Sequence, residues 1–415
     1  MSNLDLFNSK SDPIPQIRPD VDVIPINNNG DSYLYFHDIR GYVPSDFALD
    51  RSAGVILYLL DGRKNINDLQ AYLGNGTTTD ILLEYVQFLD ENRLLHSPHY
   101  KNHADEIEQK YEKSPIHQSV TAGGSYPSDT NELLAFLDEA FANYGADSGN
   151  SASNPVKALY APHIDPRIGM KTYVESFQVL RQMKPGRAVI LATSHYAGLH
   201  AKVYQNKPFI VSNKNFETPL GTIPADRDAI DFLAGDAEIM GLSTHDRAHR
   251  IEHSIELHLL FLSYIWQHDY SVIPILVGGF DELFYMDETN LGKQIDTFSK
   301  FLRNQFGQDD DTLFLISGDL AHVGKKFGDN RPAAAMKNEV ELFDEQFLTA
   351  AKNGSTQNML KLIKHDYDPY RICGFPPLYT FLKAFPDLKG QTISYDRWNQ
   401  TEAESAVTFG SILYE

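Results

Sequence analysis

The chain has 415 residues and only one cysteine, Cys373. A single thiol excludes an intramolecular disulfide and a zinc site made of cysteines alone, and it favours a reducing compartment. The amino terminus lacks the basic, apolar and small-residue order of a signal peptide. No apolar run approaches the roughly 20 residues that span a membrane. We therefore expect a cytoplasmic protein without a membrane partner.

Basic side chains are also scarce. The chain has 36 Lys and Arg against 56 Asp and Glu, which gives a net charge of −20. Nucleic-acid binding needs clustered cations, so we expect no nucleic-acid partner. Hydrophobic residues at 42% and charged residues at 22% exclude disorder of the whole chain. The length favours two domains.

Several motifs of common enzyme classes are absent. No G-x-G-x-x-G or G-K-[ST] loop is present, so nucleotide binding has no support. Ser194 and Ser317 lie outside a G-x-S-x-G elbow, which argues against a serine hydrolase. Glu256 is not spaced from His253 and His258 as in His-Glu-x-x-His, so a zinc-protease helix is not expected.

Composition divides the chain into four parts. Residues 1–14 are polar and interrupted by proline, which predicts a flexible arm. Residues 15–100 contain two alternating runs, DVIPI and SYLYFHD, that predict a β-hairpin, followed by three apolar stretches that predict three short helices. The charged residues 101–119 predict a linker helix, and residues 120–415 form the second domain.

The second domain alternates short apolar runs with helical stretches. The runs VKALYAPH, AVILATSH, SVIPILVGG and TLFLISGD predict buried strands. Longer stretches with helical periodicity lie between them, such as TYVESFQVLRQM and LGKQIDTFSKFLRNQF. This alternation is typical of an α/β domain with a buried, largely parallel sheet.

Three of these runs end in a residue that can bind a metal ion: His163, His195 and Asp319, with His322 three residues further on. Ligands bind at the carboxyl ends of strands in open α/β sheets, so these side chains are expected to converge. A turn rich in Gly and Pro, RICGFPPL, can bring Cys373 to the same rim. Imidazole, carboxylate and thiolate bind iron, copper or zinc. The alternative is that each is a buried, hydrogen-bonded group at a strand end.

The stretch THDRAHRIEHSIELH is rich in histidine. His245, His249 and His253 would share one face if a helix began early, but a loop leading into a helix is favoured. We expect Glu252, His253 and Glu256 near the pocket wall, where His253 can orient a metal ligand by hydrogen bonding or stabilise the loop. Packing is an equal alternative.

Eight motifs occur in the order AGGSYPSD, APH, ATSH, EHSIELHL, PILVG, SGDLAHVG, RICG and SAVTFGSILYE. This order resembles the Memo family, whose prokaryotic members include AmmeMemoRadiSam system protein B, over about residues 120–415. The resemblance implies an α/β sandwich related to class III extradiol dioxygenases, which use non-haem Fe(II). It also implies a metal pocket with three ligands, His163, His195 and Cys373. Asp319 and His322 would lie beside this pocket.

Two segments depart from the family pattern. The run IDPRIG follows the first histidine where the family tends to have a tyrosine, and it adds Asp165 and Arg167. Gly374 is followed by Phe-Pro-Pro instead of an Arg-His pair. We therefore expect the substrate side of the pocket to differ from that of other members.

The predicted hairpin and three short helices of residues 15–100, closed by NRLL, resemble the PqqD-like winged-helix domain. That resemblance implies docking of a peptide or of a radical-SAM enzyme. A purely structural role is the alternative, because a fold alone does not establish a function.

These observations lead to competing hypotheses. The first is a metal-dependent oxidoreductase in which His163, His195 and Cys373 hold Fe(II) or copper, His322 is the acid/base and Asp319 positions it. The second is a non-catalytic scaffold that binds a peptide or docks a partner. A zinc hydrolase is a third, since the same donors bind zinc and the sequence does not choose among the metals.

Overall fold

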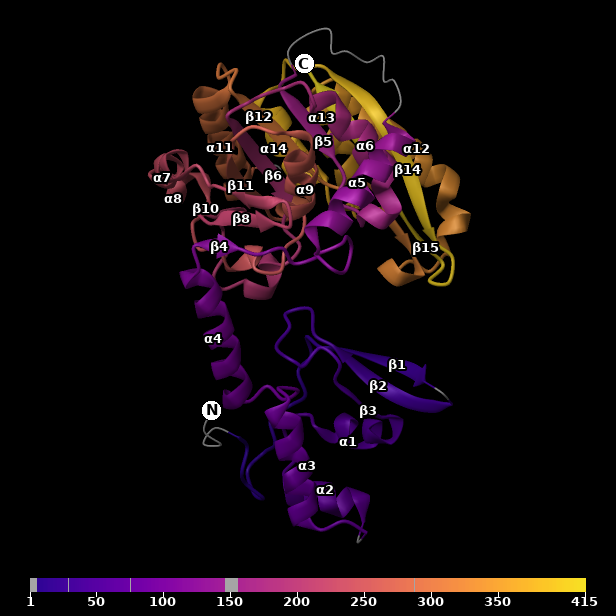
Figure 1. Cartoon of the computed structure of the whole chain (residues 1–415). Coiled ribbons are helices and arrows are strands. Elements are labelled where there is room, and N and C mark those ends of the chain that lie inside the picture. The colour runs from indigo at the N-terminus through magenta and orange to yellow at the C-terminus, as the bar shows by residue number, and fades with distance from the viewer. Residues whose placement is uncertain (1–5, 29, 75, 146–155, 287) are drawn as a thin grey trace. The chain divides into compact units, whose positions relative to one another are not determined.

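The computed structural model describes residues 6–28, 30–74, 76–145, 156–286 and 288–415. The chain divides into two compact units, Met1–Lys113 and Ser114–Glu415, which are described separately (Figure 1). No helix within the described residues is both long and apolar enough to cross a membrane.

The first unit contains the predicted β-hairpin. Strands β1 (Asp22–Asn28) and β2 (Asp31–His37) pair antiparallel, and β3 (Ala48–Asp50) pairs with β2. Within the described residues β1 is an edge strand of this three-stranded sheet, and its side chains are exposed along its length.

The three predicted helices are also present, and a fourth follows them. Their bounds are α1 (Gly54–Leu59), α2 (Ile66–Leu73), α3 (Thr79–Glu91) and α4 (Pro98–Lys113). Asn65 caps α2 in a reciprocal capping box with Asp68, and Thr78 caps α3. Gly62 adopts a left-handed conformation two residues beyond the C-cap of α1.

The segment expected to be a flexible arm lies against this unit from Phe7 onward. The Phe7 N–H donates to the Asp90 carboxylate at 2.8 Å, and Ile14 is buried in the core of the unit. The start of α4 packs here as well. The guanidinium carbon of Arg18, which is buried, lies 4.1 Å from the ring centroid of Tyr100.

The second unit is built on a nine-stranded sheet. Its strand order is β10-β7-β11-β6-β12-β5-β15-β13, with β14 paired to β15. The bounds are β5 (Ala158–Ala161), β6 (Arg187–Thr193), β7 (Phe209–Val211), β10 (Leu242–Ser243), β11 (Ser271–Val277), β12 (Thr312–Ser317), β13 (His322–Gly324), β14 (Gly390–Gln400) and β15 (Ser405–Tyr414). A small separate sheet contains β4 (Ile116–His117), β8 (Asn215–Thr218) and β9 (Gly221–Ile223).

The four predicted strands form the centre of this sheet. β11, β6, β12 and β5 are adjacent and parallel, as expected from their alternation with helices. The sheet as a whole is mixed, because β15 pairs antiparallel with β5, β13 and β14. The closing motif SAVTFGSILYE supplies β15, every residue of which is buried.

Helices cover both faces of the central strands (Figure 1). Val189 and Leu191 of β6 face a core shared with α11 and α14, whereas Ile190 faces a core shared with α6 and α9. This strict alternation buries both faces of the sheet. The helix bounds are α5 (Thr130–Tyr144), α6 (Pro166–Phe177), α7 (Arg227–Ala234), α8 (Ala237–Met240), α9 (Glu256–Ile265), α10 (Glu282–Tyr285), α11 (Asn290–Phe306), α12 (Lys337–Lys352), α13 (Thr356–Lys364) and α14 (Phe375–Ala384).

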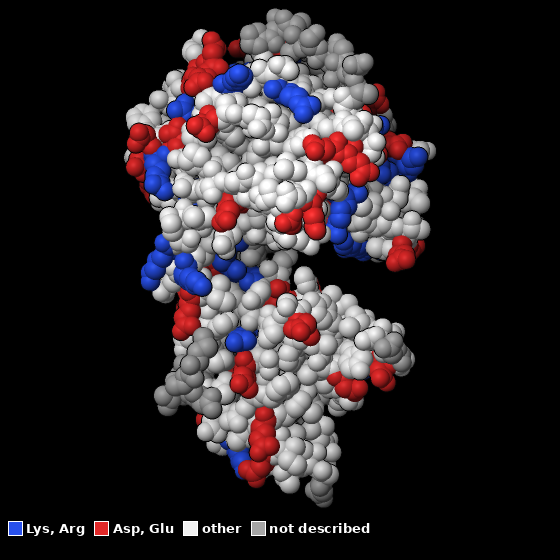
Figure 2. Space-filling model, in the orientation of Figure 1, with Lys and Arg blue, Asp and Glu red and all other residues white. Residues whose placement is uncertain are grey.

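Charged side chains are interspersed on the visible face of each unit, and no continuous basic stripe crosses it (Figure 2). The acidic excess is therefore distributed over this face and does not form a single patch.

Candidate metal centre

The three predicted strand-end residues occupy equivalent positions. His163, His195 and Asp319 each lie two residues beyond the end of their strands β5, β6 and β12. Because these strands are adjacent and parallel, their carboxyl ends meet at one edge of the sheet. The three residues are therefore close together because each follows one of three adjacent parallel strands.

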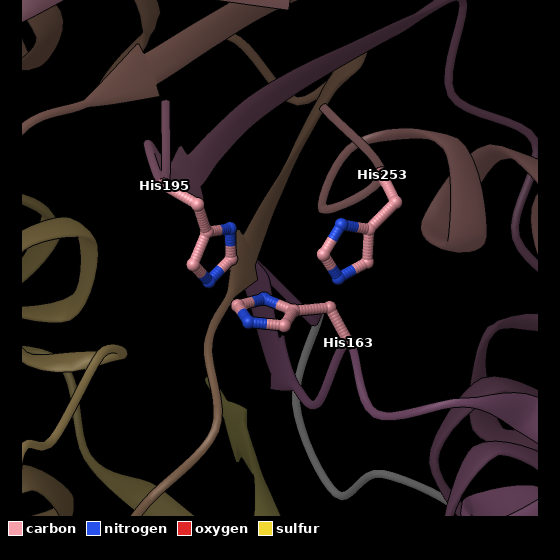
Figure 3. Close-up of side chains that lie close together, drawn as sticks. All are labelled: His163, His195 and His253. Atoms are coloured by element: carbon pink, nitrogen blue, oxygen red, sulfur yellow. The ribbon is translucent and has the colours of Figure 1, made fainter. Parts of the chain in front are cut away.

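A third imidazole joins the two strand-end histidines. His163, His195 and His253 each contribute one ring nitrogen to a group of three. These three nitrogens all lie within 4.8 Å of one another. The rings of His195 and His253 are nearly parallel, with centroids 5.2 Å apart, and His163 lies edge-on to both (Figure 3). His253 comes from the segment just before α9, so the predicted loop leading into a helix is confirmed.

Cys373 and Asp319 also lie close to the His163 ring. The Cys373 Sγ is 3.4 Å from the His163 Nε2, and an Asp319 carboxylate oxygen lies 3.9 Å from the same nitrogen. One ligand atom from each of these three residues lies within 4.8 Å of the others. The turn predicted to bring the single cysteine to the rim does so.

Two glycines allow the cysteine turn to approach the strand end. A Cβ on Gly318 would lie 2.1 Å from the Cα of Gly374, so the two backbones are in direct contact. The Thr193 hydroxyl donates to the Cys373 carbonyl at 2.8 Å, and the Asp319 N–H points to Sγ at 3.3 Å. A side chain at either glycine would displace the thiol.

Hydrogen bonding fixes which nitrogen of His163 is available. Ser317 Oγ donates to the Ser254 carbonyl at 2.7 Å, so it accepts from the His163 Nδ1–H at 3.1 Å. The lone pair is therefore on Nε2, the nitrogen that faces Cys373. Burial, together with the neighbouring His195, holds the pKa of His163 well below its usual value, so the ring is neutral.

His195 is held by a buried carboxylate. Glu252 accepts from the His195 Nδ1–H at 2.9 Å and from the His195 backbone N–H at 2.7 Å. Burial opposes ionisation of Glu252, but His195 overcomes it and lowers the pKa of Glu252 to about 2. Burial also opposes a charged His195, yet the Glu252 carboxylate raises its pKa well above the usual value. A metal ion at Nε2 would therefore displace a proton, while Nδ1–H stays on Glu252.

The two acidic groups of the site, Asp319 and Cys373, have pKa values that a bound cation would lower. Burial raises the pKa of Asp319 to about 7 and also raises the pKa of the Cys373 thiol. A nearby positive charge stabilises the ionised form of both groups, the carboxylate and the thiolate.

His322 lies in the same region but belongs to neither three-residue group. Its Nδ1 is 3.1 Å from the carbonyl oxygens of Leu320 and Arg371, so Nδ1 carries the hydrogen and Nε2 can accept a proton. Burial lowers the pKa of His322 to about 4. The ring is neutral at pH 7, as a general base must be.

Glu256 serves a different purpose from Glu252. It accepts from the Val120 N–H at 2.6 Å and the Thr121 N–H at 3.1 Å, and from the Tyr126 hydroxyl. It therefore ties the segment that carries the AGGSYPSD motif to the start of α9. Glu252, also expected near the pocket wall, is the one of these two glutamates that accepts from an imidazole.

The two departures from the family pattern have local structural roles. Asp165 caps α6 by accepting from the Arg167 N–H at 2.9 Å, and the side chain of Arg167 is 61% exposed. Pro376 and Pro377 stand in the first turn of α14, where proline is well tolerated.

Comparison with known proteins identifies the class to which this fold and site belong. The Memo-like protein family matches residues 117–413, most of the chain. The chain therefore belongs to the Memo family. The match begins near the start of the second unit and contains every candidate ligand.

Individual relatives extend this result. A "MEMO1 family protein" of Aquifex aeolicus is 26% identical over 371 residues, which cover 86% of this chain and 90% of that protein. The "MEMO1 family protein TTHA0924" of Thermus thermophilus is 27% identical over 70% of this chain and 80% of its own length. "Protein MEMO1" of Xenopus laevis is 24% identical over 70% of this chain and 92% of its own length. Since the second unit is less than three quarters of the chain, the Aquifex match extends into the first unit.

The donor set fits a borderline metal ion. Two imidazoles have their Nδ1–H groups engaged and their Nε2 atoms available, as in metal-binding histidines. A thiol and a carboxylate, Cys373 and Asp319, complete the group. These donors suit iron, copper or zinc and do not suit magnesium or calcium, which prefer oxygen alone.

Proposed function

We propose that this Memo-family chain is a metal-dependent redox protein in which His163, His195 and Cys373 hold iron or copper. The carrying observation is the convergence of Nε2 of His163 on the Cys373 sulfur at 3.4 Å, with the tautomer fixed by Ser317. The implied relation to class III extradiol dioxygenases supports an oxygen-using reaction. A bound iron or copper ion would supply electron transfer and a position for dioxygen or an oxygen-bearing substrate.

The chain's own residues manage protons around this centre. His322 is neutral and has a free Nε2, so it accepts a proton from substrate or water. Asp319 fixes the strand-end backbone by accepting from the His163 N–H at 3.0 Å. With a pKa near 7 it can also hold or release a proton at neutral pH. Glu252 keeps His195 in one orientation.

The test is elemental analysis of protein purified anaerobically without added metal. We expect close to one iron or copper per chain, and loss of that metal in His163→Ala. The matched control is His365→Ala, which removes a histidine whose side chain is 80% exposed. Loaded protein given a reductant should consume oxygen faster than His163→Ala does. Wild-type protein that takes up neither iron nor copper would overturn the proposal.

Zinc is the instructive alternative outcome. Stoichiometric zinc with no oxygen consumption would favour hydrolysis, because zinc activates water without redox chemistry. The roles of His322 and Glu252 would be unchanged in that case.

We also propose that the first unit recruits a partner, a radical-SAM enzyme or a peptide. Large hydrophobic side chains are unusually exposed on this smaller unit, and on α1 two of them, Val55 (62%) and Tyr58 (87%), lie one turn apart. Such exposed apolar surface is typical of interaction sites.

Full-length protein carrying Tyr58→Glu tests this second proposal. A co-expressed radical-SAM enzyme should be retained by the wild-type chain and lost from the variant, with metal content unchanged. Leu342→Glu, on α12 of the second unit and 55% exposed, is the control. Equal retention by all three proteins would argue against docking through α1.

A further inference from the structure

His163 belongs to both three-residue groups at the edge of the sheet. One group contains His195 and His253, and the other contains Asp319 and Cys373. We propose that the ion held by His163, His195 and Cys373 has a second possible ligand set, in which His253 takes the place of the thiolate and the three imidazoles alone bind a divalent metal. This inference rests on the proposed metal function and adds His253 as a ligand.

The argument for one ion comes from the chemistry of His163. A neutral imidazole offers one lone pair, and its Nδ1–H is already committed to Ser317. Nε2 can therefore bind only one metal ion at a time. Because both groups need this nitrogen, they describe two surroundings of the same ion and not two separate sites.

The three-imidazole set is open on its outer side. The side chains of His195 and His253 are 28% and 27% exposed, whereas His163 is 3% exposed. His163 therefore lies at the base of the group, with the other two rings facing each other above it (Figure 3). A metal ion held by three histidines keeps further positions for water or substrate.

The backbone around Glu252 positions His253 for this task. Glu252 accepts from the backbone N–H groups of both His195 and His253, at 2.7 and 3.0 Å, so one carboxylate sets the separation of the two segments. The His253 Nδ1 is 3.5 Å from Glu252.

The two sets differ in the ions they favour. A thiolate prefers soft ions such as Cu(I), whereas imidazoles suit divalent Co, Zn, Fe and Cu. We therefore expect the ion to remain bound when Cys373 is removed, and to be lost when His163 is removed. The thiolate therefore changes which ions the centre prefers, and the imidazoles keep the ion bound.

Anaerobic titration of the full chain with Co(II) tests this inference. Wild-type protein should bind one equivalent and show the near-ultraviolet thiolate-to-cobalt absorption. Cys373→Ser should still bind one equivalent, weakened by roughly 10- to 100-fold, and should lack that absorption. Cys373→Ser/His253→Ala should bind no stoichiometric cobalt, and His163→Ala should also bind none.

Two controls make the outcomes decisive. Cys373→Ala is measured beside Cys373→Ser, so that one folded thiol-free protein is available, and unfolding temperatures verify folding. Cys373→Ser/His365→Ala matches the double variant with a surface histidine removed. Thiol-free protein that folds but binds no cobalt, or that binds equally well without His253, would overturn the inference. Wild-type protein that binds no metal at all would instead overturn the proposed function.

Discussion

The Arg18 cluster of the first unit and the metal centre of the second are both buried and polar, but their hydrogen bonds are arranged differently. In the first unit all three nitrogens of the Arg18 guanidinium donate hydrogen bonds, to Asp20, to Asp38 and to the Arg93 carbonyl. Its side chain is fully buried, and Tyr100 stacks on it. Every polar atom of this arginine therefore has a protein partner.

In the metal centre the hydrogen bonds of His163, His195 and His322 to oxygen atoms all go to Nδ1. The Nε2 atom of His163 instead faces the Cys373 sulfur at 3.4 Å. The comparison teaches how to separate a structural cluster from a functional one. A saturated cluster stabilises the fold, whereas imidazole nitrogens that face a thiol and one another can exchange a proton for a cation.

Arg18→Ala should have the largest effect on stability. It leaves the nearly buried carboxylate of Asp38 without its cation, and breaking such a pair costs about 3–5 kcal/mol. We expect fast hydrogen exchange throughout the first unit and unchanged metal binding in the second. If both units lost protection against hydrogen exchange together, the expectation that they unfold independently would be contradicted.

Asp344 gives a pH-dependent effect of about 3 kcal/mol at 1.36 kcal/mol per pKa unit. This buried carboxylate accepts from the Tyr395 hydroxyl at 2.8 Å, and burial raises its pKa from 3.8 to about 6. The folded state thus binds the proton more tightly than the unfolded state does. Its contribution to stability is complete below pH 4 and is lost as the pH rises through 6.

Asp344→Asn should therefore stabilise the second unit at pH 8 and make little difference at pH 4. Urea unfolding at both pH values measures the change. A constant difference between wild type and variant at the two pH values would show that Asp344 does not titrate in this window.

Glu252→Gln should weaken metal binding by roughly 10- to 100-fold, the usual effect of losing a carboxylate behind a ligating histidine. The two carboxylate oxygens of Glu252 accept one from the side chain and one from the backbone of His195. A glutamine has only one oxygen and cannot accept both hydrogen bonds in this way. Competition with a chelator measures the affinity. Glu256→Gln is the matched control, and we expect it to affect the 120–126 segment with a smaller change in affinity.

Lys10→Ala should have the smallest effect. Lys10 pairs with Asp80 at 2.6 Å, but the two side chains are 42% and 76% exposed. Exposed ion pairs contribute about 0–1 kcal/mol. Hydrogen exchange of the first unit should be nearly unchanged, and a loss of stability close to that of Arg18→Ala would remove the contrast between saturated burial and surface pairing.

The strand pattern made much of the site predictable. His163, His195 and Asp319 each follow an apolar run, and adjacency of parallel strands brings such positions together. The sequence could not show that Glu252, instead of Glu256, contacts an imidazole. Both carboxylates precede or begin α9, and only the direction of each side chain separates them.

Apolar periodicity, the single cysteine and the ordered motifs determine the α/β class, the Memo family and the identity of the candidate donors, because these depend on local residue types. The tertiary structure decides the rest. It brings Gly318 against Gly374, directs Ser317 to Nδ1 of His163, and adds His253 to the group. These contacts join residues that are distant in the chain, and hydrogen-bond direction and close backbone approach are set only when the strands and turns have packed together.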